Sequence, residues 1–113
     1  MNTLFILNDA PYGTERSYNA LRLARTLSKE VGQTVRVFLI GDAVACAKSG
    51  QKVPEGYYNA GDMVRMAGGE IGVCSTCMDA RGMSDDQLVE GAYRSTMKKL
   101  CEWTAAADKV LVF

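Results

Sequence analysis

The segment TLFILNDAPYGTERSYNALRLARTLSKEVGQTVRVFLI, residues 3–40, contains the pattern that decides the fold of this chain. It begins with a short apolar run, Thr3 to Leu7, that ends in the turn-forming residues 8–13. Apolar residues then recur at helical spacing from Ala20 to Val31, which indicates an amphipathic helix. A second apolar run, Val35 to Ile40, is rich in β-branched residues. The order strand, helix, strand is typical of a parallel βαβ unit.

The same alternation continues through the rest of the chain. Strands are predicted at 70–73 and 110–113, and helices at 43–48, 59–67, near Leu88 and Val89, and from Ser95 or Thr96 onward. Ser84 and Gln87 have the spacing of a capping box. Repeated alternation of strands and helices predicts an α/β fold with helices on both faces of a parallel sheet.

Capping residues set the expected starts of the first two helices. Thr14 or Ser17 would begin the first helix, and Asp42 would begin the second. Gly32 stands where the first helix is expected to end.

The composition fits one domain over residues 1–113 and argues against several classes of function. The chain is 48% hydrophobic, so it can bury a core without disulfides. Its 13 basic and 13 acidic residues balance, so neither nucleic acid nor a membrane is expected as a partner. No apolar run has the length of a signal-peptide core or a membrane span. These features predict a cytoplasmic protein whose thiols stay reduced.

A pair of cysteines follows the predicted third strand. In open α/β sheets ligands gather at the carboxyl ends of strands, which is where Cys74 stands. The polar residues Ser75 and Thr76 come next, and their backbone N–H groups, together with Arg81, could stabilise a thiolate. Cys77 could resolve an oxidised or persulfidated Cys74, or pack beneath the loop.

Three explanations compete for this pair: a metal clip, a dithiol redox pair, or one working thiol with a neighbour. A structural zinc site needs four ligands, and the chain has no His. The other cysteines, Cys46 and Cys101, stand singly on apolar helix positions and are expected to pack in the core. No metal and no cofactor is therefore expected, although an open two-Cys site for a soft metal stays open as an alternative without a second half in the sequence. The dithiol explanation stays open, although Gly82 is expected to end any helix after the pair within a turn.

The segment VCSTCMDARG, residues 73–82, resembles the cysteine loop of the DsrE/DsrF-like family, especially of its YchN-like branch. In that branch a Cys-x-x-Cys-x-x-x-Arg-Gly loop precedes a short helix. The resemblance extends over 6–13, 19–24, 88–97 and 102–110, and so reaches nearly the whole chain.

The resemblance implies a three-layer α/β/α sandwich with a mostly parallel sheet of about five strands. It also implies a homo-oligomer, a trimer or a hexamer. In the sulfur-relay members of the family a single cysteine after the third strand carries a persulfide between partner proteins, and Cys74 falls at that position. Cys77 belongs to the YchN-like loop only. The implied function is a persulfide carrier without independent turnover, with sulfur-donor and sulfur-acceptor proteins as partners.

Two alternatives and several other candidate residues remain. Some members of the family lack the cysteine and serve as partner-binding or scaffold subunits, and a CxxC redox switch also fits the residues. Asn8 and Asp9 could line the site from the first loop or form an ordinary turn. Asp79 and Arg81 could bind a substrate or partner, pair with each other, or cap the loop.

Methionines beside the cysteine loop suggest an assembly surface. Met78 and Met83 flank residues 79–82, where a monomer is expected to leave them exposed to water. Methionine suits adaptable contact surfaces, so the cysteine loop is expected near a subunit boundary.

Overall fold

A five-stranded sheet, parallel throughout, forms the centre of the computed structural model, which describes residues 1–113. The strand order is β4-β3-β2-β1-β5, and each neighbouring pair runs in the same direction. The strands are β1 (Asn2–Leu7), β2 (Thr34–Leu39), β3 (Glu70–Cys74), β4 (Ala92–Ser95) and β5 (Lys109–Val112). This confirms the predicted α/β fold with a sheet of about five strands.

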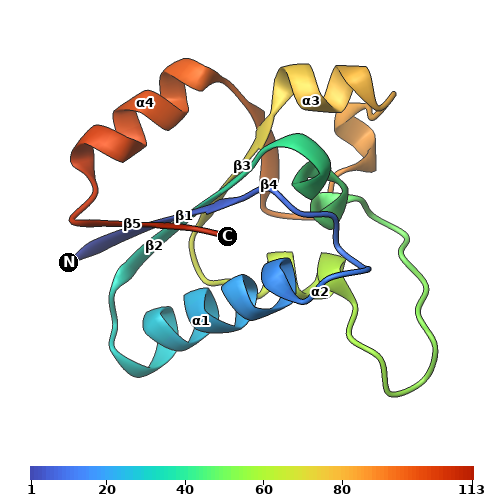
Figure 1. Cartoon of the computed structure of the whole chain (residues 1–113), viewed down its shortest axis with the longest axis horizontal. Helices are drawn as coiled ribbons and strands as arrows, with labels where there is room; N and C mark the ends of the chain where they lie inside the picture. The colour runs from blue at the N-terminus through green and yellow to red at the C-terminus, as the bar shows by residue number, and fades with distance from the viewer.

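Helices cover both faces of the sheet and complete the expected three layers. They are α1 (Arg16–Glu30), α2 (Ala60–Arg65), α3 (Ser75–Ala80) and α4 (Met97–Ala106), with short 3₁₀ helices η1 (Gly41–Ala47) and η2 (Asp85–Gln87). In Figure 1, α1 and α2 lie below the sheet and α4 lies above it. None of these helices is both long enough and apolar enough to cross a membrane.

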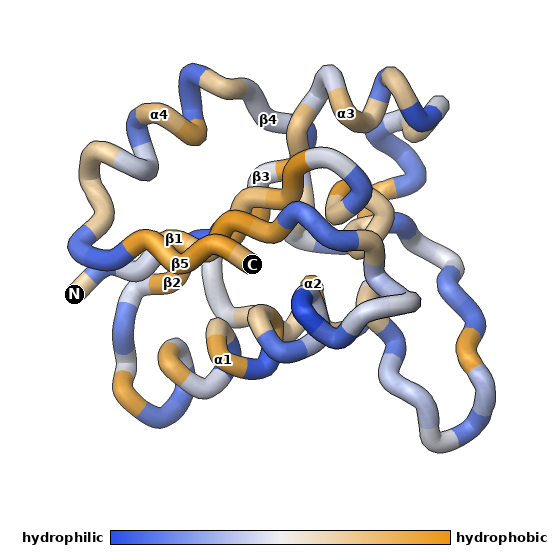
Figure 2. Tube along the Cα trace, in the orientation of Figure 1, coloured by the Kyte–Doolittle hydropathy of each residue, from blue (hydrophilic) through white to orange (hydrophobic).

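The central strands are apolar on both sides because both of their faces are covered. Leu4 and Phe5 of β1 are fully buried although they point to opposite faces, and so are Val37 and Phe38 of β2. The central strands are accordingly the most hydrophobic part of the trace in Figure 2.

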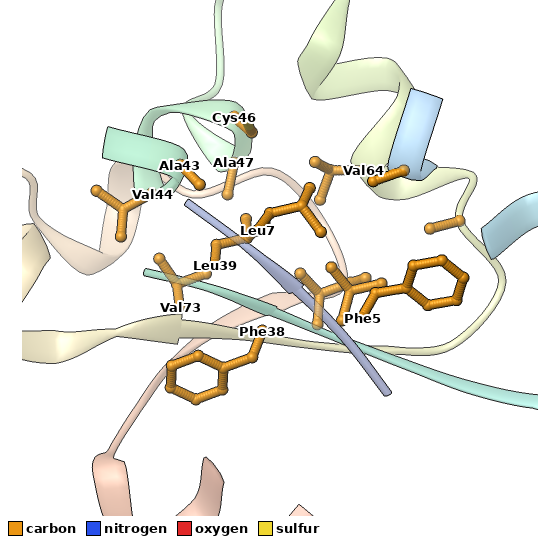
Figure 3. Close-up of a cluster of buried hydrophobic side chains, with 14 of the residues drawn as sticks. Phe5, Leu7, Phe38, Leu39, Ala43, Val44, Cys46, Ala47, Val64 and Val73 are labelled. Carbon is orange, nitrogen blue, oxygen red and sulfur yellow. The ribbon is translucent and has the colours of Figure 1, made fainter. Parts of the chain in front are cut away.

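Phe38 anchors the layer that contains α4. Its ring meets Trp103 edge-on, with 6.2 Å between ring centroids. Figure 3 shows Phe38 on the opposite side of the sheet from Val44 and Ala47, which belong to η1. Gly72 lies beside Phe38 in the sheet, and a Cβ at Gly72 would stand only 3.1 Å from the Phe38 ring. Because Gly72 has no side chain, the Phe38 ring fits beside it under α4.

Two of the predicted helix starts are wrong. α1 begins at Arg16, and neither Thr14 nor Ser17 caps it, because both hydroxyls donate to Asp9 instead. Asp42 lies inside the first turn of η1 and not before it, and this segment is a 3₁₀ helix. The helix expected near Leu88 is the short η2.

Other predicted helix ends are confirmed. The Gln87 side chain accepts the Ser84 N–H at 3.0 Å, as expected for a capping box. The Thr96 hydroxyl accepts the Lys99 N–H at 3.2 Å and caps α4. Gly32 follows the end of α1 with a positive φ of 67°.

The cysteine loop differs most from expectation, because residues 75–80 form the helix α3. α3 turns Met78 into the core, where it is 0% exposed, and Met83 behind it is 6% exposed. The expectation that both methionines would be wet in a monomer is therefore wrong, and they give no argument for an interface. Gly82 has φ +65° and ends this segment as predicted.

Met78 and Met97 offer a matched test of this packing. Met97, at the start of α4, is 61% exposed whereas Met78 is fully buried. Met78→Ala should lower the free energy of unfolding by about 2–5 kcal/mol because it leaves a cavity. Met97→Ala should change it by less than about 0.5 kcal/mol. Urea denaturation of both variants checks this, and equal effects would place Met78 outside the core.

Candidate functional site

The ends of three neighbouring strands meet at the cysteine pair. The parallel register aligns Leu7 with Leu39 and Leu39 with Val73, so β1, β2 and β3 end at one edge of the sheet. Cys74 is the last residue of β3, and Cys77 lies in the first turn of α3. The backbone N–H of Gly41, just beyond β2, donates to Sγ of Cys77 at 3.2 Å. The thiols therefore lie at the carboxyl edge of the sheet, where sequence reasoning placed them.

Cys74 is a nearly buried thiol. It is 8% exposed, and this burial is the largest cause that raises its pKa above the usual value of 9.0. The backbone N–H groups of Cys77 and Thr76 act in the opposite direction, and the neighbouring Cys77 thiol raises the pKa further. Near neutral pH the resting form of Cys74 is therefore the thiol.

Cys77 lies closer to solvent. It is half-buried, and its sulfur is the acceptor of the Gly41 N–H. The Cys77 side chain is also among the groups that raise the pKa of Cys74, so the two thiols are neighbours in unequal surroundings.

A helix starts directly after Cys74, and its position bears on the explanation of the two cysteines as a dithiol redox pair. α3 spans Ser75–Ala80 with Cys74 as its N-terminal flanking residue, and it ends within a turn after Cys77, as predicted from Gly82. A CxxC pair at the start of a helix that follows a strand is the arrangement of dithiol oxidoreductases. α3 therefore gives the pair the position of such a redox site, with a helix that is short.

Arg81 is the cation next to the pair. Its guanidinium donates to Asp42 Oδ1 at 2.7 and 3.2 Å and to the carbonyl oxygen of Cys77 at 3.1 Å. The carboxylate of Asp42 is the main cause that raises the pKa of Arg81, and both thiols contribute in the same direction. Arg81 thus ties α3 to η1 and keeps a positive charge beside the sulfur atoms.

Comparison with known proteins gives the chain its family. The model of the DsrE/DsrF-like family matches residues 1–113. The chain belongs to the DsrE/DsrF-like family. It is 40% identical to Protein YchN of Escherichia coli K12 over 97% of both chains, and 37% identical to an uncharacterized protein of Methanocaldococcus jannaschii over 100% of both. The family is often linked to sulfur metabolism.

Solved structures support the same grouping. The crystal structure of YchN from E. coli superimposes with a TM-score of 0.92 at 39% identity, covering 99% of this chain and 98% of that one. A protein of unknown function from Methanobacterium thermoautotrophicum shares the fold, with a TM-score of 0.73 at 16% identity over 97% of both chains.

Arg94 of β4 is a site residue that the sequence analysis did not predict. It donates to the Ser75 hydroxyl at 2.7 Å, to Asp79 at 2.9 Å and to Asp85 at 2.6 Å, and also reaches the backbone carbonyls of Ser75 and Met83. These bonds hold the first and second turns of α3 against β4 and η2. The missed signal was the strand itself, since β4 is four residues long and reads as a polar segment.

Asp79 and Arg81 do not pair with each other. Asp79 binds Arg94, and Arg81 binds Asp42 from the opposite side of α3. The alternative in which these two residues neutralise one another is therefore wrong.

Asn8 and Asp9 stabilise the loop after β1. The Asn8 side chain donates to the carbonyl of Phe113 at 3.1 Å, and Asp9 accepts the Thr14 hydroxyl at 3.0 Å and pairs with Arg16 at 3.5 Å. Their side chains have no hydrogen bond to either thiol. Asn8 still borders the site through its backbone, since a Cβ on Gly41 would lie 3.7 Å from its carbonyl oxygen.

The two remaining cysteines have opposite surroundings. Cys46 of η1 is fully buried, as predicted. Cys101 is exposed, so the prediction that it packs in the core is wrong. α4 buries a narrow stripe that contains Leu100 and Trp103, and Cys101 falls beside it.

A polar hollow of about 250 Å³ lies away from the thiols. No Cys and none of Asn8, Asp9, Asp79 or Arg81 is among its lining residues, which are Lys48, Ser49, Gly50, Gln51, Asn59, Gly61, Asp62, Arg65, Leu88, Val89 and Glu90.

The buried Cys46 thiol should make stability depend on pH in the alkaline range. Burial raises its pKa from 9.0 to about 11, so the folded protein holds this proton more tightly than the unfolded chain does. Its contribution is complete below pH 9 and is lost as the pH rises to about 11, a loss of about 2–3 kcal/mol. Cys46→Ala should remove this part of the decline. Urea denaturation at several pH values measures it, and parallel pH profiles for the two proteins would contradict it.

Proposed function

We propose that this protein is a cytoplasmic sulfur carrier in which Cys74 holds sulfur as a persulfide between a donor protein and an acceptor protein. The observation that carries the proposal is the position of two neighbouring thiols at the carboxyl edge of the sheet, where Cys74 ends β3 and the Gly41 N–H donates to Cys77. The family's link to sulfur metabolism supports the same function.

The chemistry is thiol exchange with sulfur as the cargo. A thiolate of the pair attacks the outer sulfur of a donor persulfide, a new S–S bond forms, the donor leaves as a thiolate, and Cys74 holds the sulfur as a persulfide. An acceptor thiolate then attacks the same outer sulfur, and Cys74 leaves as a thiolate. The two steps need no outside oxidant or reductant, because sulfur moves at constant oxidation level. The protein acts as a carrier and has no turnover of its own.

Rigid support favours such a carrier. Arg94 and Arg81 hold α3 from two sides through side chains on β4 and η1, so the backbone that follows Cys74 is fixed in place. Fixed reacting groups lower the entropic barrier to transfer.

Sulfur loading tests the proposal. After incubation with glutathione persulfide, mass spectrometry with fragmentation should find one added sulfur on Cys74, and Cys74→Ser should abolish stable loading. Cys101→Ser is the matched control and should load like the wild type, because Cys101 lies exposed on α4 away from the pair. Sulfur found on Cys46 or Cys101 alone, with none on Cys74, would refute the proposal. Full partner binding by an unloadable protein would instead favour a scaffold subunit.

A dithiol redox switch is the second candidate, and the start of α3 directly after Cys74 favours it. In this case Cys74 and Cys77 would pass two electrons and two protons to a disulfide of another molecule, which becomes two thiols, and would form a disulfide themselves. Protein-film voltammetry would then show a reversible two-electron wave that disappears in either single Ser variant. Wild-type protein without this wave would reject the switch.

We also propose that the protein forms a closed homo-oligomer, a trimer or a hexamer, through the sheet face beside α4. Val110 and Val112 align with Leu4 and Ile6, and Ile6 aligns with Phe38, so all of them point to the α4 side. α4 leaves part of this face open, since Val110 and Val112 are exposed. An apolar patch on an edge strand invites association.

Sedimentation at micromolar concentration tests the assembly. We expect a particle several times the 12.3 kDa chain mass, and Val112→Glu should dissociate it by burying a charge in the interface. Val31→Glu, at the end of α1, is the matched control because Val31 is similarly exposed, at 61% against 65% for Val112. A wild-type particle of 12.3 kDa refutes the assembly. A Val112→Glu protein that stays large excludes this face.

A further inference from the structure

Cys74 and Cys77 differ in the property that decides which of them can meet a donor. Cys74 is 8% exposed, whereas Cys77 is half-buried and lies one helical turn further along. Sulfur transfer requires the attacking sulfur to approach the donor S–S bond along its axis, so the attacking side chain must be accessible. A nearly buried thiol is poorly placed to attack a sulfur atom that is held by another molecule.

The surroundings of Cys77 suit an attacking and leaving thiolate. The Gly41 N–H points at its sulfur at 3.2 Å, and hydrogen bonds to an ionised acceptor are stronger than those to a neutral one. Arg81, whose guanidinium binds the Cys77 carbonyl at 3.1 Å, adds a positive charge nearby. No comparable fixed cation binds the backbone of Cys74.

From this we infer that Cys77 is the residue on which sulfur first arrives, and that it passes the sulfur inward to Cys74. The inference rests on the proposed carrier function and assigns the residue through which that function is loaded. Cys74 remains the residue that stores the sulfur.

The internal step balances without another reactant. Cys74 Sγ attacks the outer sulfur of the Cys77 persulfide, the bond between that sulfur and Cys77 Sγ breaks, and Cys77 leaves with the electron pair. The proton of the Cys74 thiol passes to the Cys77 sulfur as that sulfur leaves. The products are a Cys74 persulfide and a Cys77 thiol, so the total number of sulfur atoms, protons and electrons is unchanged.

The direction of transfer follows from the unequal surroundings. The Gly41 N–H, which reaches Cys77 Sγ at 3.2 Å, can donate to Cys77 as it leaves. Burial raises the pKa of Cys74, and a more basic thiolate is the stronger nucleophile. Burial also shelters the stored persulfide at Cys74 from thiols in bulk solvent, since access limits such exchange.

A time course of loading distinguishes the two thiols. Wild-type protein is mixed with glutathione persulfide, quenched with an alkylating reagent, and fragmented to locate the added sulfur. Sulfur should appear first on Cys77 and then accumulate on Cys74. In Cys77→Ser, loading of Cys74 should slow by about tenfold or more, because the accessible thiol is gone. In Cys74→Ser, sulfur should stay on Cys77 and remain open to removal by added thiol.

Controls separate a lost thiol from a disturbed fold. Cys77→Ala should slow loading as much as Cys77→Ser does, and both should unfold at the wild-type urea concentration within error. Cys101→Ser, which changes an exposed cysteine on α4, should load at the wild-type rate.

The contrary outcomes are distinct from one another. If Cys77→Ser loads Cys74 at the wild-type rate, the relay is wrong while the carrier function stands. If a Cys74–Cys77 disulfide forms with release of hydrosulfide, Cys77 acts as a resolving thiol and the relay is again overturned. If wild-type protein takes up sulfur on neither thiol, the carrier function and the relay both fail.

Discussion

The parallel pairing of β1, β2 and β3 is the constraint on which the thiol site depends. Because Leu39 aligns with Val73, the residues that follow β2 and β3 leave the sheet side by side. Gly41 and Cys77 can therefore meet through an N–H···S hydrogen bond although they are far apart in the sequence. A shift of register between the two strands would break this bond and would also misplace the gap at Gly72 that receives the Phe38 ring.

Most of the fold could be predicted from the sequence because the central strands and the long helices have clear patterns of apolar residues. Apolar runs at 3–7 and 35–40 marked the two strands that are buried on both faces, and the spacing from Ala20 to Val31 marked α1. β4 escaped because an edge strand of four residues with one buried side chain, Ser95, has no such pattern. The segment of α3 predicts a loop because it is short and many of its residues are polar. Its stability as a helix comes from partners in β4 and η1.

The site could be predicted in part for the same reason. Cys74 and Cys77 were visible because cysteines at this spacing after a strand are unusual, and the structure brings them together at the sheet edge. Their inequality was not visible, since burial of one thiol and the Gly41 contact of the other arise only when β2, β3 and α3 are packed. Arg94 escaped with its strand, and the partners of Asp79 and Arg81 lie 15 and 39 residues away in the sequence.

Arg94 joins the part of the structure that makes the fold to the part that carries the thiols. Its guanidinium donates hydrogen bonds to Ser75, Asp79 and Asp85. The turns around Cys74 are therefore held by charge-assisted hydrogen bonds and not by burial alone. Apolar packing from Met78 fixes the other side of α3. A short helix is unstable by itself, and here tertiary contacts on both sides compensate. With α3 held in this way, Cys77 in its first turn is half-buried while Cys74, directly before the helix, is buried.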